Sequence, residues 1–252
     1  MLDEADMANQ ASTIRNDLYD WACEGSLNRG GLLLLNRPRR WALMLAVCFG
    51  FLSMAHAQAQ AQYALGKTTQ ELPKRGGNGG QPAGPLKCDD GYVVTGIHGT
   101  IYKLRPARLG LICRRLNADG TLGDRKTGDL TAPPKTAPPK DVNPDDDFYH
   151  QCGQGEVVVG FYGWSDPYID QLGFWCAKPE DWMNRKPPTR GRLVIGSAEK
   201  KVESKDFDDK CDQYQNDKKR YVVTQIAVQT GWHLDQEKAT CTELTKTETP
   251  KR

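Results

Sequence analysis

Two short segments bring aromatic rings, carboxylates and an imidazole close together in a sequence of 252 residues. The first runs from Tyr162 to Tyr168 (YGWSDPY), and the second runs from Thr230 to His233 (TGWH). Aromatic faces stack on the apolar side of a sugar ring, while carboxylates and imidazoles bind its hydroxyl groups. The candidate ligand-binding residues are therefore these segments' polar and aromatic side chains and the aspartates that follow: Trp164, Asp166, Tyr168, Asp170, Trp232, His233 and Asp235.

Other roles for the same side chains remain open. Aromatic residues can cover a small core, and Asp170 and Asp235 can cap turns. Asp166 and Asp170 could also hydrolyse a glycosidic bond, because a pair of carboxylates at a suitable separation performs that reaction. The sequence contains no GxSxG, HExxH or P-loop motif, so it favours a non-catalytic protein and assigns no catalytic residue.

Three copies of one cysteine-framed pattern must position these residues. The copies span 88–113, 152–176 and 211–241, and each contains a Val-Val pair. The closing cysteine follows the first Val of the pair by 20, 19 and 19 residues, and the opening cysteine precedes it by 5, 5 and 11. Each copy begins and ends with a β-rich run, and turn-forming residues lie between, which predicts strand, loop and strand. We therefore predict an all-β domain of three antiparallel repeats.

The same spacing predicts three disulfides. In an antiparallel pair the start of the first strand lies beside the end of the second, so cysteines there reach the ~5.5 Å Cα separation of a bridge. Of the pairings that six cysteines allow, this geometry favours Cys88–Cys113, Cys152–Cys176 and Cys211–Cys241. Zinc is the alternative ligand for these cysteines, but no CxxC spacing occurs. No metal site and no cofactor are predicted.

The first 57 residues have the layout of a leader that is removed. Arg37–Arg40 precede the apolar run Trp41–Met54, and Ala55-His-Ala57 follows as a small-x-small cleavage site. The apolar run is too short to span a bilayer, so we do not expect an integral membrane protein. This layout predicts a signal peptide that ends near Ala57 and export to the periplasm or the extracellular space. Such oxidising compartments favour disulfides.

The composition of the chain indicates where the domain and its linkers begin and end. We expect a flexible arm at 58–75, one all-β domain at 76–244 and a polar tail at 245–252. Within the domain, we expect linkers at 117–147 and 178–192. The net charge of the chain is only +2, which is too mild to predict a nucleic-acid partner.

The linker at 117–147 combines a turn, a Pro-rich duplication and an acidic run. Asn117–Gly120 (NADG) predicts a hairpin turn, and Thr131–Lys140 (TAPPKTAPPK) predicts extended polyproline geometry. Asp141–Asp147 offers oxygen ligands for calcium but lacks the glycine and the glutamate of a calcium-binding loop. A solvated acidic linker is therefore favoured.

Four stretches of the chain carry a resemblance to a known group: Gly76–Gly80 (GGNGG), Gly91–Ile97, Gly155–Phe161 and Ile169–Leu172. In these stretches, the sequence resembles the β-prism proteins of the vitelline membrane outer layer protein type and the bacterial jacalin-like modules. Over roughly residues 76–244, the resemblance implies three Greek-key-like sheets around a pseudo-threefold axis. It also implies a role in binding glycans or coating a surface, and no cofactor.

Two departures from the repeat pattern argue against three identical sites. Pro106-Ala107 stands in the first repeat where the others have Ile169-Asp170 and Leu234-Asp235. In the third repeat Gln225 replaces the glycine of the other two.

These observations predict an exported, disulfide-stabilised, non-catalytic module that binds glycans or envelope polysaccharide, in the manner of a lectin. Two alternatives remain open. One is a secreted interaction or inhibitor protein that acts on a protein partner, and the other is a glycan-processing enzyme.

Overall fold

Antiparallel strands make up nearly all of the chain that the structure describes. This computed structural model describes residues 61–132, 147–197, 202–213 and 218–248. One short helix, α2 (Pro179–Met183), accompanies the strands. Within these ranges, no helix is long and apolar enough to cross a membrane. The predicted all-β fold class is confirmed.

Several sequence predictions concern residues outside the described ranges. The leader 1–57 lies there, as do most of the Pro-rich duplication and all but the last residue of the acidic run Asp141–Asp147. Residues 214–217, in the longer segment between the opening cysteine and the Val-Val pair of the third repeat, also lie there.

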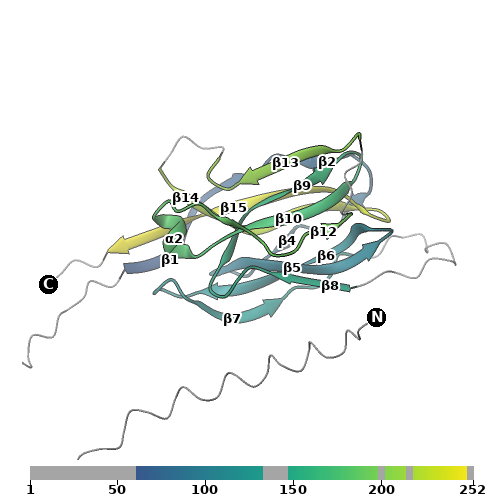
Figure 1. Cartoon of the computed structure of the whole chain (residues 1–252). Coiled ribbons are helices and arrows are strands. Elements are labelled where there is room, and N and C mark those ends of the chain that lie inside the picture. Colours follow the sequence, from purple (N-terminus) through teal and green to yellow (C-terminus); the bar gives the residue numbers. More distant parts are fainter. Residues whose placement is uncertain (1–60, 133–146, 198–201, 214–217, 249–252) are drawn as a thin grey trace, which may run out of the picture. The chain divides into compact units, whose positions relative to one another are not determined.

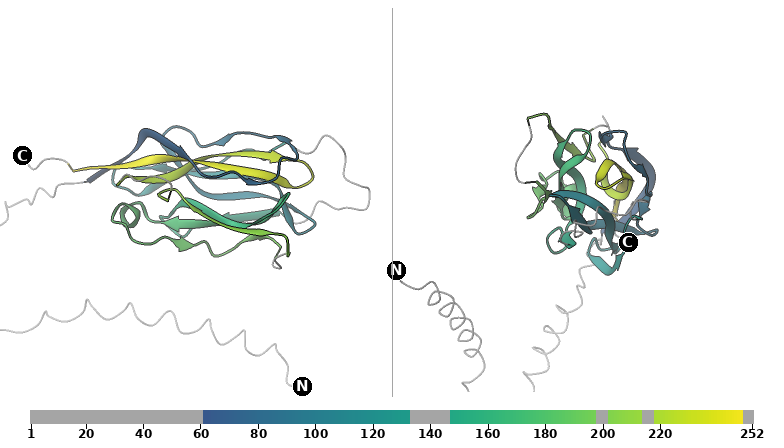
Figure 2. Two further views of the ribbon diagram at one scale, coloured as in Figure 1. Left: turned by 90° about the horizontal axis from the view of Figure 1, so that it is seen from above. Right: turned by 90° about the vertical axis from the view of Figure 1, so that its right-hand side faces the viewer.

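The three cysteine-framed repeats form three hairpins, and each hairpin is the centre of one sheet (Figure 1). The paired strands are β5 (Tyr92–Tyr102) with β6 (Arg105–Leu116), β9 (Val157–Ser165) with β10 (Ile169–Ala177), and β14 (Arg220–Thr230) with β15 (Leu234–Glu248). Figure 2 (right) looks along the strands and shows the sheets arranged around a common interior.

Each hairpin is flanked by strands that lie elsewhere in the sequence. The strands that pair with the second strand of a hairpin are β1 (Ala61–Glu71) and β2 (Arg75–Gly76) on β15, β7 (Leu122–Thr127) on β6, and β11 (Thr189–Arg190) and β12 (Ile195–Gly196) on β10. The strands that pair with the first strand are β3 (Gln81–Pro82) and β4 (Leu86–Lys87) on β14, β8 (Asp147–Gln151) on β5, and β13 (Lys205–Lys210) on β9. The strands leading into one repeat therefore pair with the hairpin of the preceding repeat, in a cyclic order.

We call these pairings the strand exchange, because each repeat supplies strands to the sheet of its neighbour. Backbone hydrogen bonds continue the strand exchange in all three sheets. The N–H of each opening cysteine donates to a carbonyl of the neighbouring sheet: Cys88 to Thr224 at 3.0 Å, Cys152 to Thr95 at 2.9 Å and Cys211 to Val159 at 2.8 Å. All three acceptors directly follow a Val-Val pair. The domain consequently has the pseudo-threefold, β-prism-like arrangement that the sequence predicted.

The Val-Val pairs recur because both faces of these strands are buried. The first Val of each pair (Val93, Val157, Val222) lies in a smaller apolar cluster with Trp182 of α2, and the second Val (Val94, Val158, Val223) lies in the core shared by the three sheets. Successive strand residues point to opposite faces, so a double Val fills both clusters at once. All six side chains are 0–1% exposed.

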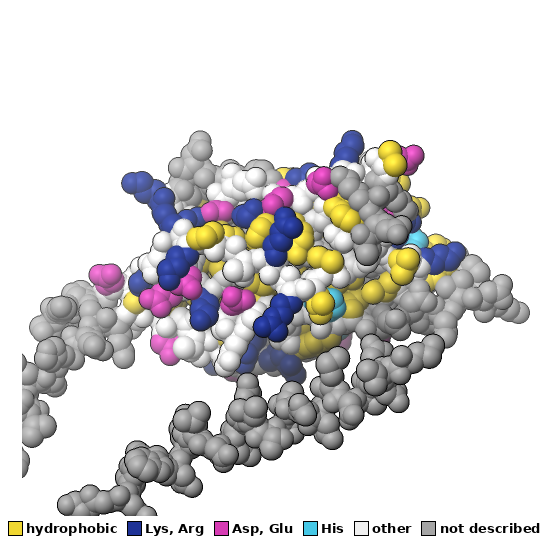
Figure 3. Space-filling view, in the orientation of Figure 1, with side chains coloured by type: hydrophobic (Ala, Val, Ile, Leu, Met, Phe, Trp, Pro, Cys, Tyr) yellow, Lys and Arg dark blue, Asp and Glu magenta, His cyan; other side chains and the backbone are white. Residues whose placement is uncertain are grey.

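The surface of the domain is mixed in charge. Figure 3 shows Lys and Arg side chains interspersed with Asp and Glu over one face. Among the described residues, large apolar side chains that are exposed include Leu104, Tyr149 and Leu193. Leu104 is 70% exposed and lies at the tip of the β5–β6 hairpin.

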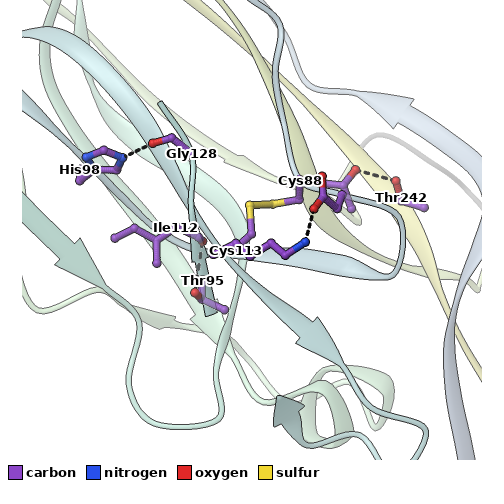
Figure 4. Close-up of a disulfide and its surroundings, with 10 residues drawn as sticks. Cys88, Thr95, His98, Ile112, Cys113, Gly128 and Thr242 are labelled. Carbon is purple, nitrogen blue, oxygen red and sulfur yellow. Dashed lines mark hydrogen bonds and ion pairs between the residues drawn. A yellow bond between two sulfur atoms is a disulfide. The ribbon is translucent and has the colours of Figure 1, made fainter. Parts of the chain in front are cut away.

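The three predicted disulfide pairings are confirmed. The Cα atoms lie 5.8 Å apart in Cys88–Cys113, 5.6 Å in Cys152–Cys176 and 5.8 Å in Cys211–Cys241. Figure 4 shows the first bridge beside the hydrogen bond from Thr95 to the Ile112 carbonyl.

The reason we gave for the pairings is wrong. Cys88 does not lie within the hairpin that Cys113 closes, because Val94 occupies the place opposite Cys113 in β5. Each opening cysteine instead follows an exchanged strand that belongs to the neighbouring sheet. Each bridge therefore ties two sheets together, and it stabilises the fold by roughly 3–4 kcal/mol in the chain-entropy model.

Several predicted linkers belong to the sheets. Strand β1 occupies most of the expected flexible arm at 58–75, and β15 extends to Glu248 into the expected tail at 245–252. The linker at 117–147 contains β7, and the linker at 178–192 contains α2 and β11. These segments escaped prediction because their strands expose mainly polar side chains and are held by backbone pairing, which leaves little apolar periodicity. The turn at Asn117–Gly120 is confirmed by the bond from the Gly120 N–H to the Asn117 carbonyl.

Candidate functional site

The tips of the three central hairpins meet at one end of the described domain. Figure 1 shows the β5–β6 and β14–β15 tips at the same end. Arg105, Tyr168 and His233 are equivalent, because each stands eight residues before the closing cysteine of its repeat. The Arg105 guanidinium lies 5.0 Å from the ring centre of Tyr168, and the rings of Tyr168 and His233 are 5.3 Å apart. Equivalent positions of the three repeats thus lie close together near the pseudo-threefold axis, and they carry three different side chains, which form one cluster.

A cavity of about 680 Å³ opens beside this cluster. Its lining residues come from the glycine-rich segment and from all three hairpins: Gly79, Gly80, Tyr102, Lys103, Tyr168, Gly231, Trp232, His233 and Asp235. Cavities of roughly 300–1,000 Å³ hold small organic ligands. We call this cavity the tip pocket.

Asp235 is the acidic residue of the tip pocket, and glycine backbone surrounds it. Its Oδ2 accepts a hydrogen bond from the Gly231 N–H at 2.6 Å. A Cβ atom on Gly79 would lie 2.5 Å from Oδ1, and one on Gly80 would lie 2.6 Å from Oδ2. Any side chain at either glycine would therefore clash with the carboxylate. Burial raises the pKa of Asp235, although the N–H of Gly231 opposes the shift.

Aromatic rings form another part of the tip pocket. The rings of Tyr102 and Trp232 are 5.9 Å apart and tilted by 33°, and Tyr102 also lies 5.1 Å from His233. Trp232 and His233 are half-buried. These rings offer apolar contact to a ligand whose polar groups face Asp235.

His233 remains neutral at neutral pH. Burial is the main reason that its pKa falls to about 4, and the nearby charges of Arg105 and Lys103 lower it further. Asp170 and the Tyr102 backbone act in the opposite direction. The buried Nδ1 has no hydrogen-bond partner among the described residues. The imidazole therefore lines the tip pocket as an uncharged ring.

Asp170 of the second repeat is equivalent to Asp235, because both stand six residues before the closing cysteine, but Asp170 does not line the tip pocket. Asp170 Oδ1 accepts from Arg105 Nε at 2.7 Å, and Oδ2 accepts from the Ser204 hydroxyl at 2.8 Å. The first repeat has Ala107 at this position. The three positions thus differ in structure, as the sequence departures indicated, and the carboxylate that lines the tip pocket is that of the third repeat.

The β5–β6 turn carries unusual backbone geometry beside the tip pocket. Tyr102 pairs with Arg105, so Lys103 and Leu104 are the two turn residues. Their φ angles are 48° and 61°, in the left-handed region that asparagine and glycine usually occupy in such turns. For other residues this conformation costs roughly 1–2 kcal/mol each. The turn therefore stores strain next to the cavity.

The structure gathers four of the seven candidate residues. Tyr168, Trp232, His233 and Asp235 line the tip pocket, whereas Trp164, Asp166 and Asp170 are not among its lining residues. The sequence analysis missed five lining residues: Gly79, Gly80, Tyr102, Lys103 and Gly231. The glycine-rich run at 76–80 was the available signal for the first two, because it carried the resemblance to the β-prism proteins, but we named no binding residue in it.

Comparison with known proteins shows a likeness in fold alone. No family model matches the chain, and no curated protein matches it in sequence. Among solved structures, the chain is similar to Calsepa lectin in complex with a bisected glycan (10% identity, TM-score 0.44, covering 69% of this chain and 97% of that one). It is also similar to Calystegia sepium agglutinin (12%, 0.44, 72% and 99%) and to artocarpin, a lectin with mannose specificity (16%, 0.43, 71% and 99%). Identities this low leave the ligand of this chain to be argued from its own pocket.

Proposed function

We propose that the protein is an exported, non-catalytic module that binds glycans in the tip pocket. The observation that carries the proposal is the Asp235 carboxylate, held against glycine backbone in a cavity that aromatic rings also line. A sugar presents hydroxyls that donate to a carboxylate and an apolar C–H face that packs on aromatic rings. Three disulfides support the proposed export, because they persist in oxidising compartments.

The carboxylates favour binding over catalysis. Glycoside hydrolysis usually needs two carboxyl groups that flank the bond to be cleaved. Asp235 lines the tip pocket, whereas both oxygens of Asp170 accept hydrogen bonds from neighbouring side chains. Among the described residues that line the tip pocket, Asp235 is therefore one of the two carboxyl groups that hydrolysis usually needs, and a second is not among them.

A glycan array tests the proposal with a matched pair of tryptophan variants. We expect Trp232→Ala to lower the affinity for the bound glycans roughly tenfold, because packing on a single aromatic ring is worth on the order of 1–3 kcal/mol for a nucleobase and we expect a similar value for a sugar. Asp235→Asn should have an effect of similar size, because it removes the charge of the hydroxyl acceptor. Trp164→Ala is the control, since Trp164 is equally half-buried and does not line the tip pocket.

Three outcomes would contradict the proposal. The first is an array to which the unmodified chain does not bind. The second is an equal loss of affinity in Trp232→Ala and Trp164→Ala, which would indicate a general effect on the fold. The third is turnover of a bound oligosaccharide, which would favour the enzyme alternative. A specific protein recovered by pull-down, without glycan binding, would favour the interaction or inhibitor alternative.

A further inference from the structure

The tip pocket has a cationic side as well as an acidic one. Lys103 lines it from the turn of the first repeat, and its ammonium lies 5.6 Å from the ring centre of Tyr102. Asp235 lines it from the third repeat, among the glycines. A ligand in the tip pocket therefore meets a carboxylate beside one hairpin and an ammonium beside another.

The positive charge is particular to the first repeat. Its tip reads Lys103-Leu104-Arg105, while the corresponding tips read Asp166-Pro167-Tyr168 and Gly231-Trp232-His233. Arg105 forms an ion pair with the buried Asp170 at 2.7 Å, so its charge is offset within the protein. Among the described residues that line the tip pocket, Lys103 is the cation.

Lys103 and Leu104 are unusual residues for this turn. Both have left-handed backbone that asparagine or glycine would adopt at lower cost, and the Leu104 side chain is 70% exposed. Strained backbone of this kind persists where the strained residues serve a function. Contact with a ligand would give both side chains such a function.

On the basis of the proposed function, we propose that Lys103 selects acidic glycans, whose carboxylate or sulfate group it binds while the hydroxyls of the sugar face Asp235. An ammonium on a flexible stem pairs with either anion as a point charge. Leu104, beside it, supplies apolar contact to the ring or to the next sugar. The carboxylate of Asp235 repels an anionic group from its own side, so the two charges fix the direction in which the ligand lies.

Matched oligosaccharide pairs test this selectivity. The full chain is titrated calorimetrically with oligouronates and their methyl esters, and with sulfated and unsulfated forms of one galactan oligomer. In each pair that binds, we expect the acidic member to bind roughly tenfold more tightly, which corresponds to about 1.4 kcal/mol. The uronate and sulfate arms distinguish the two sources of charge. The preference should weaken at high salt, because screening reduces interactions between exposed charges.

Variants of the turn connect the preference to Lys103. Lys103→Gln should reduce the ratio of acidic to neutral affinity from roughly ten to about one, and Lys103→Arg should restore it. The double variant Lys103→Asn/Leu104→Gly should lose the preference while its melting temperature rises by about 2–4 °C, because the turn is relaxed. That rise separates a loss of ligand contact from a loss of folding.

The possible failures are distinct. Equal affinity for both members of every bound pair, or an unchanged ratio in Lys103→Gln, would overturn the acidic preference and leave the proposed glycan site intact. A preference for the acidic member that is retained in Lys103→Asn/Leu104→Gly would overturn it as well. If neither member of any pair binds while the glycan array shows other bound glycans, only the acidic preference is overturned. If the array also shows no binding, the proposed function fails together with this inference.

Discussion

Glu237 occupies a position that is apolar in the other two repeats. It stands four residues before its closing cysteine, where those repeats have Leu109 and Leu172, and it is 3% exposed. Asp209 lies nearby, and Arg75 binds it through two hydrogen bonds of 2.6 Å. Burial raises the pKa of Glu237 to about 8, the charge of Asp209 adds to this effect, and Arg75 opposes it. The carboxyl group is therefore protonated at neutral pH in the folded protein.

This carboxyl makes stability depend on pH. Between about pH 4.5 and pH 8 the unfolded chain ionises Glu237 while the folded chain keeps it protonated. Unfolding then releases a proton, so the free energy of unfolding falls as pH rises through this window, by a few kcal/mol. Glu237→Gln should flatten this fall and stabilise the protein at pH 8, as measured by urea unfolding from pH 5 to pH 8.

A surface glutamate provides the control for that measurement. Glu71→Gln removes a carboxylate that is 62% exposed and paired with Lys238, so it should leave the slope nearly unchanged. A slope that persists in Glu237→Gln would mean that another group titrates in this window.

Sequence patterns could indicate the types of binding residue but not all their neighbours. The spacing that makes Asp170 equivalent to Asp235 is visible in the sequence. However, Arg105 and Ser204, which donate hydrogen bonds to the Asp170 carboxylate, belong to other segments of the chain. Gly79 and Gly80 are separated from Asp235 by more than one complete repeat. Such contacts depend on how the strands are exchanged, which no local pattern records.

The exchanged strands explain the glycines of the first two hairpins. A Cβ atom on Gly96 would lie 2.2 Å from the carbonyl oxygen of His150, and one on Gly160 would lie 2.2 Å from that of Asp209. Both carbonyls belong to a strand that leads into the next repeat, β8 for His150 and β13 for Asp209. In the third repeat, Gln225 faces β4, which is two residues long.

This difference gives a direct test of the strand exchange. Gly96→Ala should lower the free energy of unfolding by about 1–3 kcal/mol, as expected for an overpacked site, while Gln225→Ala should change it by about 0.5 kcal/mol or less. Guanidinium unfolding of the two variants measures both values. Equal effects would show that β8 does not approach Gly96 as closely as the structure indicates.

Hairpin formation was predictable and the partners of each hairpin were not. Cysteine spacing and Val-Val pairs located three hairpins, because those residues serve a local strand and a shared core. The polar edge strands β1 and β7 gave no comparable signal, since their backbone pairing stabilises them without apolar side chains at regular intervals. The disulfides were paired correctly from spacing, although they connect sheets and do not close hairpins.

The complete domain depends on its three bridges. At roughly 3–4 kcal/mol each, they contribute about as much as the whole free energy of unfolding of a typical domain, which is about 5–15 kcal/mol. We expect the chain to unfold at 37 °C in a strong reductant and to remain folded without it, as followed by circular dichroism. Retention of the folded spectrum after complete reduction, verified by thiol titration, would show that the apolar core alone is sufficient.

The exchange of strands also sets the order in which the domain can be completed. One sheet combines β1 to β4, from the start of the domain, with β14 and β15, from its end. During synthesis that sheet cannot close until the last repeat has emerged from the ribosome, and until then the hairpins that form earlier lack a neighbour on the open side. A domain that is complete only when its first and last strands meet therefore leaves strand edges unpaired until synthesis reaches its last repeat.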